Sequence, residues 1–185
     1  MSILGPPPIS AAELAERILA DSDLSWDWGE RPVKALLYNL GRAAALNVSC
    51  RKQGLPKDVN VHEWLLDLVW MDKTGMKLAV ESEWSRVMAH RLDDFEKLMS
   101  IKSPLKLFIY ATGSPSESGN VHRELTKYMQ GEDEPGFSQH LEGEEYILME
   151  IRDGNAHFYH YTVPNTGSVT KVAFAPLELK EGSSA

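Results

Sequence analysis

The stretch at residues 62–86 constrains the fold of this chain more than any other. Two apolar runs rich in Val, Leu and Trp, 64–71 and 77–84, flank the polar sequence DKTG at 72–75. This composition is typical of a strand, a turn and a second strand. A three-residue hairpin loop normally ends in a glycine in the left-handed region, which makes 73–75 the expected loop and Gly75 its last residue. The stretch therefore predicts a β-hairpin.

The loop determines which residues of the hairpin face each other. It places Trp70 opposite Leu78, and counting on along the ladder brings Asp67 opposite Glu81. Directly opposed residues share a face of the sheet. Glu83 lies two residues beyond Glu81, and alternate side chains of a strand share a face. We therefore expect three carboxylates on one face of the hairpin.

Three acids on one face of an apolar hairpin repel one another, because like charges placed opposite each other destabilise a strand pair. A bound cation removes that cost. Mg²⁺ takes oxygen ligands and is usually held by one or two carboxylates, with water and substrate phosphate completing its coordination. We therefore take Asp67, Glu81 and Glu83 as candidate ligands for Mg²⁺ or Mn²⁺. The alternative is an acidic face turned to solvent, but both faces of the hairpin carry apolar residues, which favours a central hairpin covered by helices.

The arrangement of Asp67, thirteen residues and then Glu81-Ser82-Glu83, followed by a helix and a strand, resembles the PD-(D/E)XK, or restriction-endonuclease-like, nuclease superfamily. In that pattern the two acids bind metal and a lysine assists the attacking water. The resemblance implies an α/β fold with three α/β/α layers, a central mixed sheet and a core of order αβββαβ. The chain departs from the pattern at Leu66, where the family has Pro, and at Glu83, where it has Lys.

The resemblance implies a metal-dependent nuclease that hydrolyses phosphodiester bonds in nucleic acid, with Asp67 and Glu81 holding Mg²⁺ or Mn²⁺. Glu83 is then a third ligand or a base that orients water. Arg91 on the following helix, or Lys106, would stabilise charge that develops on the phosphate. Arg91 falls inside the apolar stripe of that helix, where a charged residue is unusual unless it is paired.

The alternative is a nuclease-fold module that has lost catalysis and binds a protein or a nucleic acid. The missing lysine and the net charge of −8 favour the module, because phosphate binding usually leaves a basic footprint. The cost of an acid cluster without a ligand favours the enzyme, and both hypotheses stay open. A glycosidase is disfavoured, because opposed strand residues lie only about 5 Å apart and the sequence around them does not indicate an aromatic-lined cleft.

The rest of the chain is expected to supply the scaffold. Hydrophobic periodicity and caps predict an extra N-terminal helix at 10–21 and further helices at 33–50, 87–101 and 121–130. Strands are predicted at 105–111 and 170–174, and a C-terminal β-hairpin at 145–152 and 156–163. The sequence GSPSESGN at 113–120 is expected to be a flexible loop. The family core has a strand before the hairpin, so either 59–62 is a short strand or the run at 64–71 supplies both that strand and the first strand of the hairpin.

Length and composition set the remaining expectations. A chain of 185 residues predicts one domain over 1–178, with a core at 33–111, an extension at 112–178 and a disordered tail at 179–185. No apolar run is long enough for a membrane span and the first residues do not resemble a signal peptide, so we expect a cytoplasmic protein without a membrane partner. The single Cys50 excludes an internal disulfide. Candidate partners are nucleic acid and a second copy of the chain in a homodimer.

Overall fold

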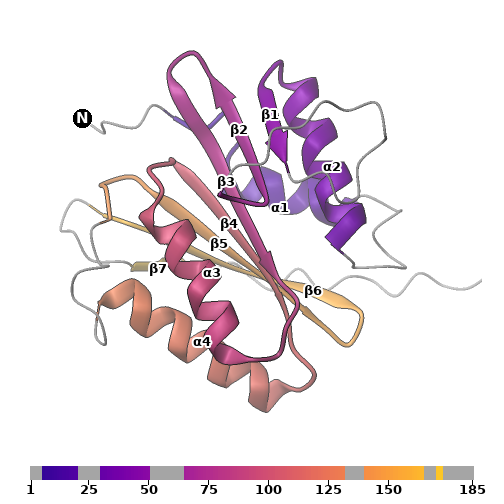
Figure 1. The fold of residues 1–185 in the computed structure, drawn as a ribbon, viewed down its shortest axis with the longest axis vertical. Helices are drawn as coiled ribbons and strands as arrows, with labels where there is room; N and C mark the ends of the chain where they lie inside the picture. The colour runs from indigo at the N-terminus through magenta and orange to yellow at the C-terminus, as the bar shows by residue number, and fades with distance from the viewer. Residues whose placement is uncertain (1–5, 21–29, 51–64, 132–139, 165–169, 173–185) are drawn as a thin grey trace, which may run out of the picture.

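The computed structural model describes residues 6–20, 30–50, 65–131, 140–164 and 170–172. Along the chain, its elements are α1 (Ala11–Ala20), α2 (Glu30–Ala43), β1 (Asn47–Cys50), β2 (Leu68–Asp72), β3 (Gly75–Glu83), α3 (Met88–Ser100), β4 (Leu105–Ala111), α4 (Pro115–Gln130), β5 (Glu145–Arg152), β6 (Asn155–Thr162) and β7 (Thr170–Val172) (Figure 1).

The described strands form one open mixed sheet in the order β1-β2-β3-β4-β5-β6-β7. β1, β2 and β3 make an antiparallel meander. β4 is parallel to β3 and β5 is parallel to β4, because α3 and α4 carry the chain back across the sheet before each new strand. β6 and β7 complete the sheet in antiparallel pairs. The predicted α/β class with a mixed sheet is confirmed.

Helices cover both faces of this sheet (Figure 1). One apolar core lies between α1, α2 and the sheet, and includes Leu14, Leu37 and Trp70. The second core lies between α3, α4 and the opposite face, and includes Phe95 and Leu125. β4 and β5 contribute alternate residues to both cores, so these central strands are apolar on both sides.

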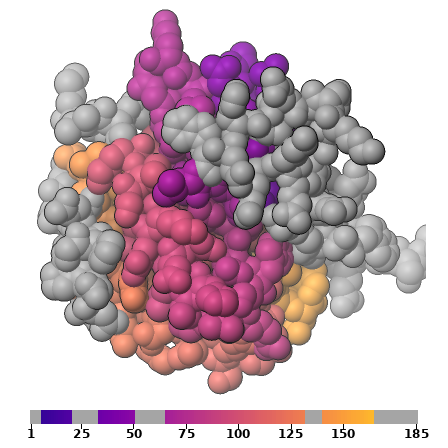
Figure 2. Space-filling model, viewed as in Figure 1, coloured from indigo at the N-terminus to yellow at the C-terminus, as the bar shows by residue number. Residues whose placement is uncertain are grey.

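The predicted hairpin is present as β2 and β3, with Trp70 opposite Leu78 as the sequence indicated. Its turn differs from the prediction. Met71 faces Met76 and Asp72 faces Gly75, so the ladder shifts by one residue next to Trp70 and Gly75 belongs to the strand. Asp72 stabilises the tighter turn, because its Oδ1 accepts hydrogen bonds from the Thr74 backbone N at 2.7 Å and from the Thr74 hydroxyl at 2.6 Å. The tip of the hairpin projects from the described surface (Figure 2).

The strand that precedes the hairpin is β1, which the sequence did not reveal. The prediction of one helix over 33–50 was wrong, because α2 ends at Ala43 and Ala45 adopts a positive φ of 58°. The chain then turns into β1, where Val48 faces Trp70. β2 begins only at Leu68, so the run at 64–71 does not supply two strands. The other expectation, a strand at 59–62, lies outside the described residues.

The prediction of a loop over 113–120 was also wrong, because α4 already begins at Pro115. Ser114 caps this helix, and its side chain accepts a hydrogen bond from the Glu117 backbone N at 3.2 Å. Proline is suited to the first helical position and Ser-x-x-Glu is a capping pattern. These local signals outweigh the glycine-rich and serine-rich composition of the segment.

Five elements agree with the sequence within one residue at each end, namely α1, α3, β4, β5 and β6. α1 begins after Ser10, whose hydroxyl accepts from the Glu13 backbone N at 3.1 Å. The parallel strand at 105–111 and the hairpin of β5 and β6 are confirmed. β7 ends at Val172 within the described residues, and the expected tail at 179–185 lies outside them. Cys50 is buried. None of the described helices is both long and apolar enough to cross a membrane.

Candidate functional site

Asp67 and Glu81 lie close together where the hairpin enters the sheet. Asp67 immediately precedes β2, whose first ladder pair is Leu68 with Val80, and the negative charge of Asp67 raises the pKa of Glu81. Only 8% of Asp67 and 4% of Glu81 is exposed. Two of the predicted acids are therefore buried within electrostatic reach of each other, and their role as a metal-binding pair stays a prediction.

Protein donors hold the carboxylate of Asp67. Its Oδ1 accepts from Lys34 Nζ at 3.0 Å, and its Oδ2 accepts from the Ser82 backbone N at 3.0 Å and from the Ser82 hydroxyl at 2.6 Å. Lys34 belongs to α2, and only 2% of it is exposed. Its buried ammonium balances the negative charge of Asp67. Neighbouring side chains of a strand point to opposite faces, so the contact with the Ser82 hydroxyl turns the Asp67 carboxylate towards the face that α2 covers, whereas the Glu81 side chain starts on the face that α3 covers.

Glu81 has a different environment. Its Oε1 is buried and has no hydrogen-bond partner within the part of the chain that the structure describes. The pKa of Glu81 is raised to about 8, chiefly by burial and then by the negative charges of Asp67 and Asp94, which outweigh the lowering by Lys97 and Lys34. A cation beside Glu81 would favour the ionised carboxylate and give the free oxygen a partner. The pair therefore fits a divalent cation.

A second lysine comes from α3. Lys97 pairs with Asp94 one helical turn away, and 43% of its side chain is exposed. The pKa of Lys97 is raised mainly by this hydrogen bond, and to a smaller extent by the negative charges of Glu81 and Asp67. The Lys97 ammonium is therefore within electrostatic reach of the acid pair while its head stays accessible to solvent.

Glu83 does not join the pair as the third ligand that the sequence suggested. Its Oε1 accepts a hydrogen bond from the Ser85 backbone N at 2.5 Å and so closes the turn that follows β3. Among the described residues, no three His, Cys, Asp or Glu side chains are arranged to hold a metal ion. Of the three predicted acids, Asp67 and Glu81 thus influence each other electrostatically, whereas Glu83 bonds to the turn after β3.

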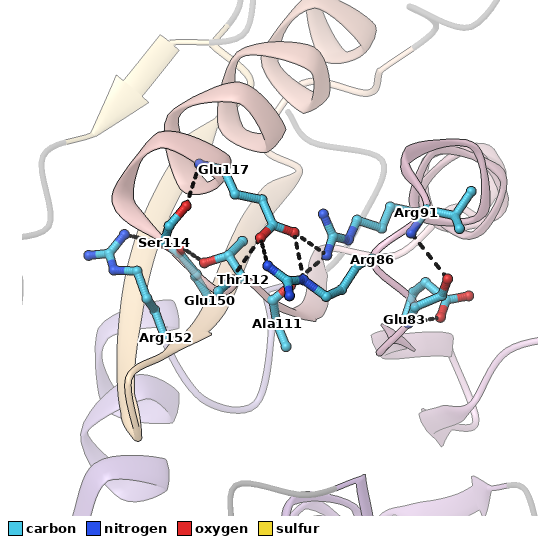
Figure 3. Close-up of polar contacts among 12 residues, drawn as sticks. Glu83, Arg86, Arg91, Ala111, Thr112, Ser114, Glu117, Glu150 and Arg152 are labelled. Carbon is cyan, nitrogen blue, oxygen red and sulfur yellow. Dashed lines mark hydrogen bonds and ion pairs between the residues drawn. The ribbon is translucent and has the colours of Figure 1, made fainter.

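Arg91 is buried within α3 as predicted, but its guanidinium contacts a different acid. Its Nη2 donates to the Ala111 carbonyl at 2.6 Å and to Glu117 Oε1 at 3.1 Å, both outside the predicted acid cluster. Figure 3 shows this contact beside that of Arg86 with the same carboxylate. The expectation that Arg91 reaches back to the hairpin acids is therefore not met by its hydrogen bonds.

Lys106, the other substitute considered for the missing lysine, lies in a separate buried cluster. Its ammonium is 3.0 Å from Glu144 Oε2, donates to the Tyr146 hydroxyl at 2.7 Å and lies over the Tyr146 ring. Burial lowers the pKa of Lys106 to about 8. Its ladder partner is Ala79, in the middle of β3. These contacts give Lys106 a structural role between β4 and β5.

Sequence reasoning missed Lys34 and Lys97 as members of the site. Lys34 lies three residues before Leu37, so both fall on the same stripe of α2. A lysine on the apolar side of a helix indicates a buried cation that needs an acidic partner, and this signal could have revealed Lys34. The spacing of Asp94 and Lys97 indicates an ion pair on one face of α3, but only the packing of α3 on β3 brings it to Glu81.

No family model matches this chain, and the comparisons with curated proteins and with solved structures also gave no match. The nuclease resemblance therefore rests on the residues and on the order of the elements.

Proposed function

We propose that this protein is a divalent-metal-dependent nuclease of the PD-(D/E)XK type that hydrolyses phosphodiester bonds in nucleic acid. The observation that carries the proposal is the buried pair of Asp67 and Glu81, in which one Glu81 oxygen has no partner among the described residues. The order α2-β1-β2-β3-α3-β4, with an antiparallel meander followed by a parallel strand, supports it, because the resemblance implies a core of order αβββαβ.

Asp67 and Glu81 would hold Mg²⁺ or Mn²⁺. Two carboxylates suffice, because Mg²⁺ usually keeps several waters and takes further oxygens from substrate phosphate. When bound, the cation would supply a water of lowered pKa and charge stabilisation at the phosphate. Glu81 must lose its proton to serve as a ligand, so we expect metal affinity to increase as pH rises towards the Glu81 pKa of about 8.

The other residues of the site have roles that follow from their contacts. Lys34 and Ser82 fix the orientation of Asp67 through three hydrogen bonds. Lys97 would take the role of the missing motif lysine, because it is a half-exposed lysine near the acid pair. Its ammonium would stabilise negative charge on a phosphate bound there. Glu83 shapes the turn between β3 and α3 through Ser85.

A specific observation favours the second candidate, a nuclease-fold binding module without catalysis. Lys34 already balances the charge of Asp67, and both oxygens of Asp67 have protein donors. The acids can therefore persist in a folded protein without a metal, which removes one of the arguments for an enzyme that the sequence alone offered.

Cleavage assays separate the two functions. Wild type, Glu81→Gln and Asp67→Asn would be incubated with labelled single-stranded, duplex and branched DNA and with RNA, in Mn²⁺, in Mg²⁺ and in EDTA. We expect wild type to cleave only with metal and Glu81→Gln to lose about 100-fold or more of the rate, which corresponds to about 2.7 kcal/mol of transition-state stabilisation.

Glu16→Gln on the exposed side of α1 is the matched control, because it makes the same change of charge away from the site. It should cleave like wild type. Cleavage that survives in Glu81→Gln would contradict the assignment of the site. An inactive wild type in every metal and substrate would leave the binding module as the function.

A further inference from the structure

Two guanidinium groups and a backbone amide converge on the carboxylate of Glu117 in α4 (Figure 3). Glu117 Oε1 accepts from Arg86 Nε at 3.3 Å and from Arg91 Nη2 at 3.1 Å. Glu117 Oε2 accepts from the Gly113 backbone N at 2.9 Å and from Arg86 Nη2. The donors come from the turn after β3, from α3 and from the loop before α4. We call Arg86, Arg91 and the Gly113 amide the arginine pocket.

The arginine pocket carries more positive charge than Glu117 neutralises. Two guanidinium groups face one carboxylate, and the pKa of Glu117 is lowered to about 2, chiefly by its hydrogen bond with Arg86. Arg91 is only 1% exposed, and its Nε is buried without a hydrogen-bond partner in the described part of the chain. The pocket therefore stabilises an anion strongly and keeps one buried donor unused.

The Arg86 side of the arginine pocket is accessible to solvent, because 66% of the Arg86 side chain is exposed. The Arg86 guanidinium lies directly against Gly113, because a Cβ at Gly113 would be 2.2 Å from Arg86 Nη2. Any side chain at position 113 would therefore collide with the Arg86 guanidinium in its present position. A planar guanidinium binds a carboxylate and a phosphate with the same bidentate geometry.

The arginine pocket lies beyond the end of β3 that carries Glu81 and Glu83. Glu81 faces Phe108 of β4 and Glu83 faces Tyr110. The next residue, Ala111, accepts the hydrogen bond from Arg91. The pocket therefore lies just past Glu83, at the carboxyl ends of the parallel strands β3 and β4. Open α/β sheets commonly bind ligands at this edge.

From these contacts we propose that the arginine pocket binds a backbone phosphate of nucleic acid, and that Glu117 fills the pocket in the free protein and yields it to the phosphate. The choice of nucleic acid as the ligand rests on the proposed function. The exchange replaces one anion by another, so Arg91 keeps a negative partner throughout. In an acidic protein, it also gives the phosphate backbone a positive contact at the edge of the sheet where β3 and β4 end.

Fluorescence anisotropy with labelled single-stranded and duplex DNA tests the proposal, with EDTA present so that no strand is cut. Glu117→Gln should tighten binding about tenfold, because it removes the internal competitor; tenfold corresponds to about 1.4 kcal/mol. Arg86→Gln should weaken binding about tenfold and reduce the salt dependence by about one phosphate contact. Arg86 is mostly exposed, so its variant is expected to fold, and circular dichroism would verify this.

Two controls on α4 match these changes of charge. Arg123→Gln and Glu124→Gln alter an ion pair outside the pocket, and 61% of the Arg123 side chain is exposed. Both should bind DNA within about twofold of wild type. If Glu124→Gln tightens binding as much as Glu117→Gln, net charge explains the effect and the pocket proposal is overturned. Absence of binding by both wild type and Glu117→Gln would also overturn it.

The outcome separates this proposal from the proposed function. Suppose that wild type cleaves with metal and that Arg86→Gln and Glu117→Gln leave both binding and KM unchanged. The phosphate-binding proposal is then wrong, and the nuclease proposal stands. Suppose instead that Glu117→Gln tightens binding and Arg86→Gln weakens it, but that the protein cuts no substrate. The phosphate-binding proposal then stands, and the nuclease proposal is wrong.

Discussion

At the scale of single residues, the two acids of the hairpin differ in what surrounds them. Asp67 has a buried ammonium and two donors from Ser82, whereas Glu81 has a buried oxygen without a described partner and a pKa of about 8. Paired carboxylates with unequal environments are a recurring feature of catalytic sites. Under the proposed function, Asp67 would be the ligand of fixed orientation and Glu81 the group that changes charge when a cation binds.

The raised pKa of Glu81 predicts a pH dependence of stability in the absence of metal. Between the ordinary pKa of 4.5 and about 8, folded Glu81 keeps a proton that the unfolded chain has released. Raising the pH through this window should therefore lower the free energy of unfolding, by up to about 1.4 kcal/mol per pH unit. Urea unfolding of wild type and Glu81→Gln in EDTA measures the difference. The stability of the variant relative to wild type should increase from pH 5 to pH 8, and a constant difference would refute the assignment.

Lys34 predicts a strong coupling to Asp67. Lys34→Met leaves the Asp67 carboxylate buried without its cation, and breaking such a pair typically costs about 3–5 kcal/mol. The double variant Lys34→Met with Asp67→Asn should cost less than the sum of the two single changes. Denaturant unfolding of all four proteins completes the cycle. Additive costs would show that the 3.0 Å contact does not contribute to folding.

At the scale of elements, the position of a glycine within the packing decides what it contributes to a helix. Gly119 lies in α4, and no atom is within 4 Å of the position that a Cβ would occupy there. By contrast, a Cβ on Gly41 in α2 would be 2.5 Å from Trp70 Nε1 and 2.6 Å from Val48 Cγ2. α2 therefore needs its glycine to approach β1 and β2, and α4 does not.

The same substitution should consequently have opposite effects in the two helices. Gly119→Ala should raise the free energy of unfolding by about 0.5–1 kcal/mol, the usual gain from replacing glycine in an exposed helix. Gly41→Ala should lower it by about 1–3 kcal/mol, the range for overpacking a core. Thermal or urea unfolding compares both with wild type. Stabilisation by Gly41→Ala would mean that α2 is not held against the hairpin as described.

The elements that the sequence revealed are those with strong local signals. The hairpin follows from the alternation of apolar residues, but its turn is one residue tighter than predicted. Trp70 still faces Leu78 because a one-residue shift in the ladder next to Trp70 offsets the tighter turn, and no local pattern predicts that shift. β1 has four residues and follows α2 closely, so the helical period of α2 obscured it. Lys34 joins the site from 33 positions before Asp67, a contact that depends on the packing of α2 and that no local pattern encodes.

At the scale of the whole molecule, the C-terminal hairpin belongs to the same sheet as the candidate site. β5 pairs with β4 from Leu105 to Ala111, and α1 packs against β5 and β6. The region at 112–178 that the sequence marked as an extension thus supplies strands that cover the edge of β4. The core at 33–111 exposes an apolar central strand when it is isolated.

A truncated chain tests this integration. A protein ending at Gln130 lacks β5 and β6 and leaves the buried strand β4 unpaired on one side. We expect it to lose cooperative unfolding, because edge strands that are apolar on both faces associate rather than fold. Circular dichroism during heating and size-exclusion chromatography provide the readout. A monomeric truncation with a sharp transition would show that the segment up to α4 folds independently.

The most direct test of the acid pair as a metal site is the melting temperature with and without Mn²⁺. A cation that binds only the folded protein stabilises it, and at about 100-fold above its Kd the expected shift is about 5–10 °C. We expect this shift for wild type and for Glu16→Gln, and its loss in Asp67→Asn and Glu81→Gln. An equal shift in all four proteins, or no shift in wild type at millimolar Mn²⁺, would rule out a metal site at Asp67 and Glu81.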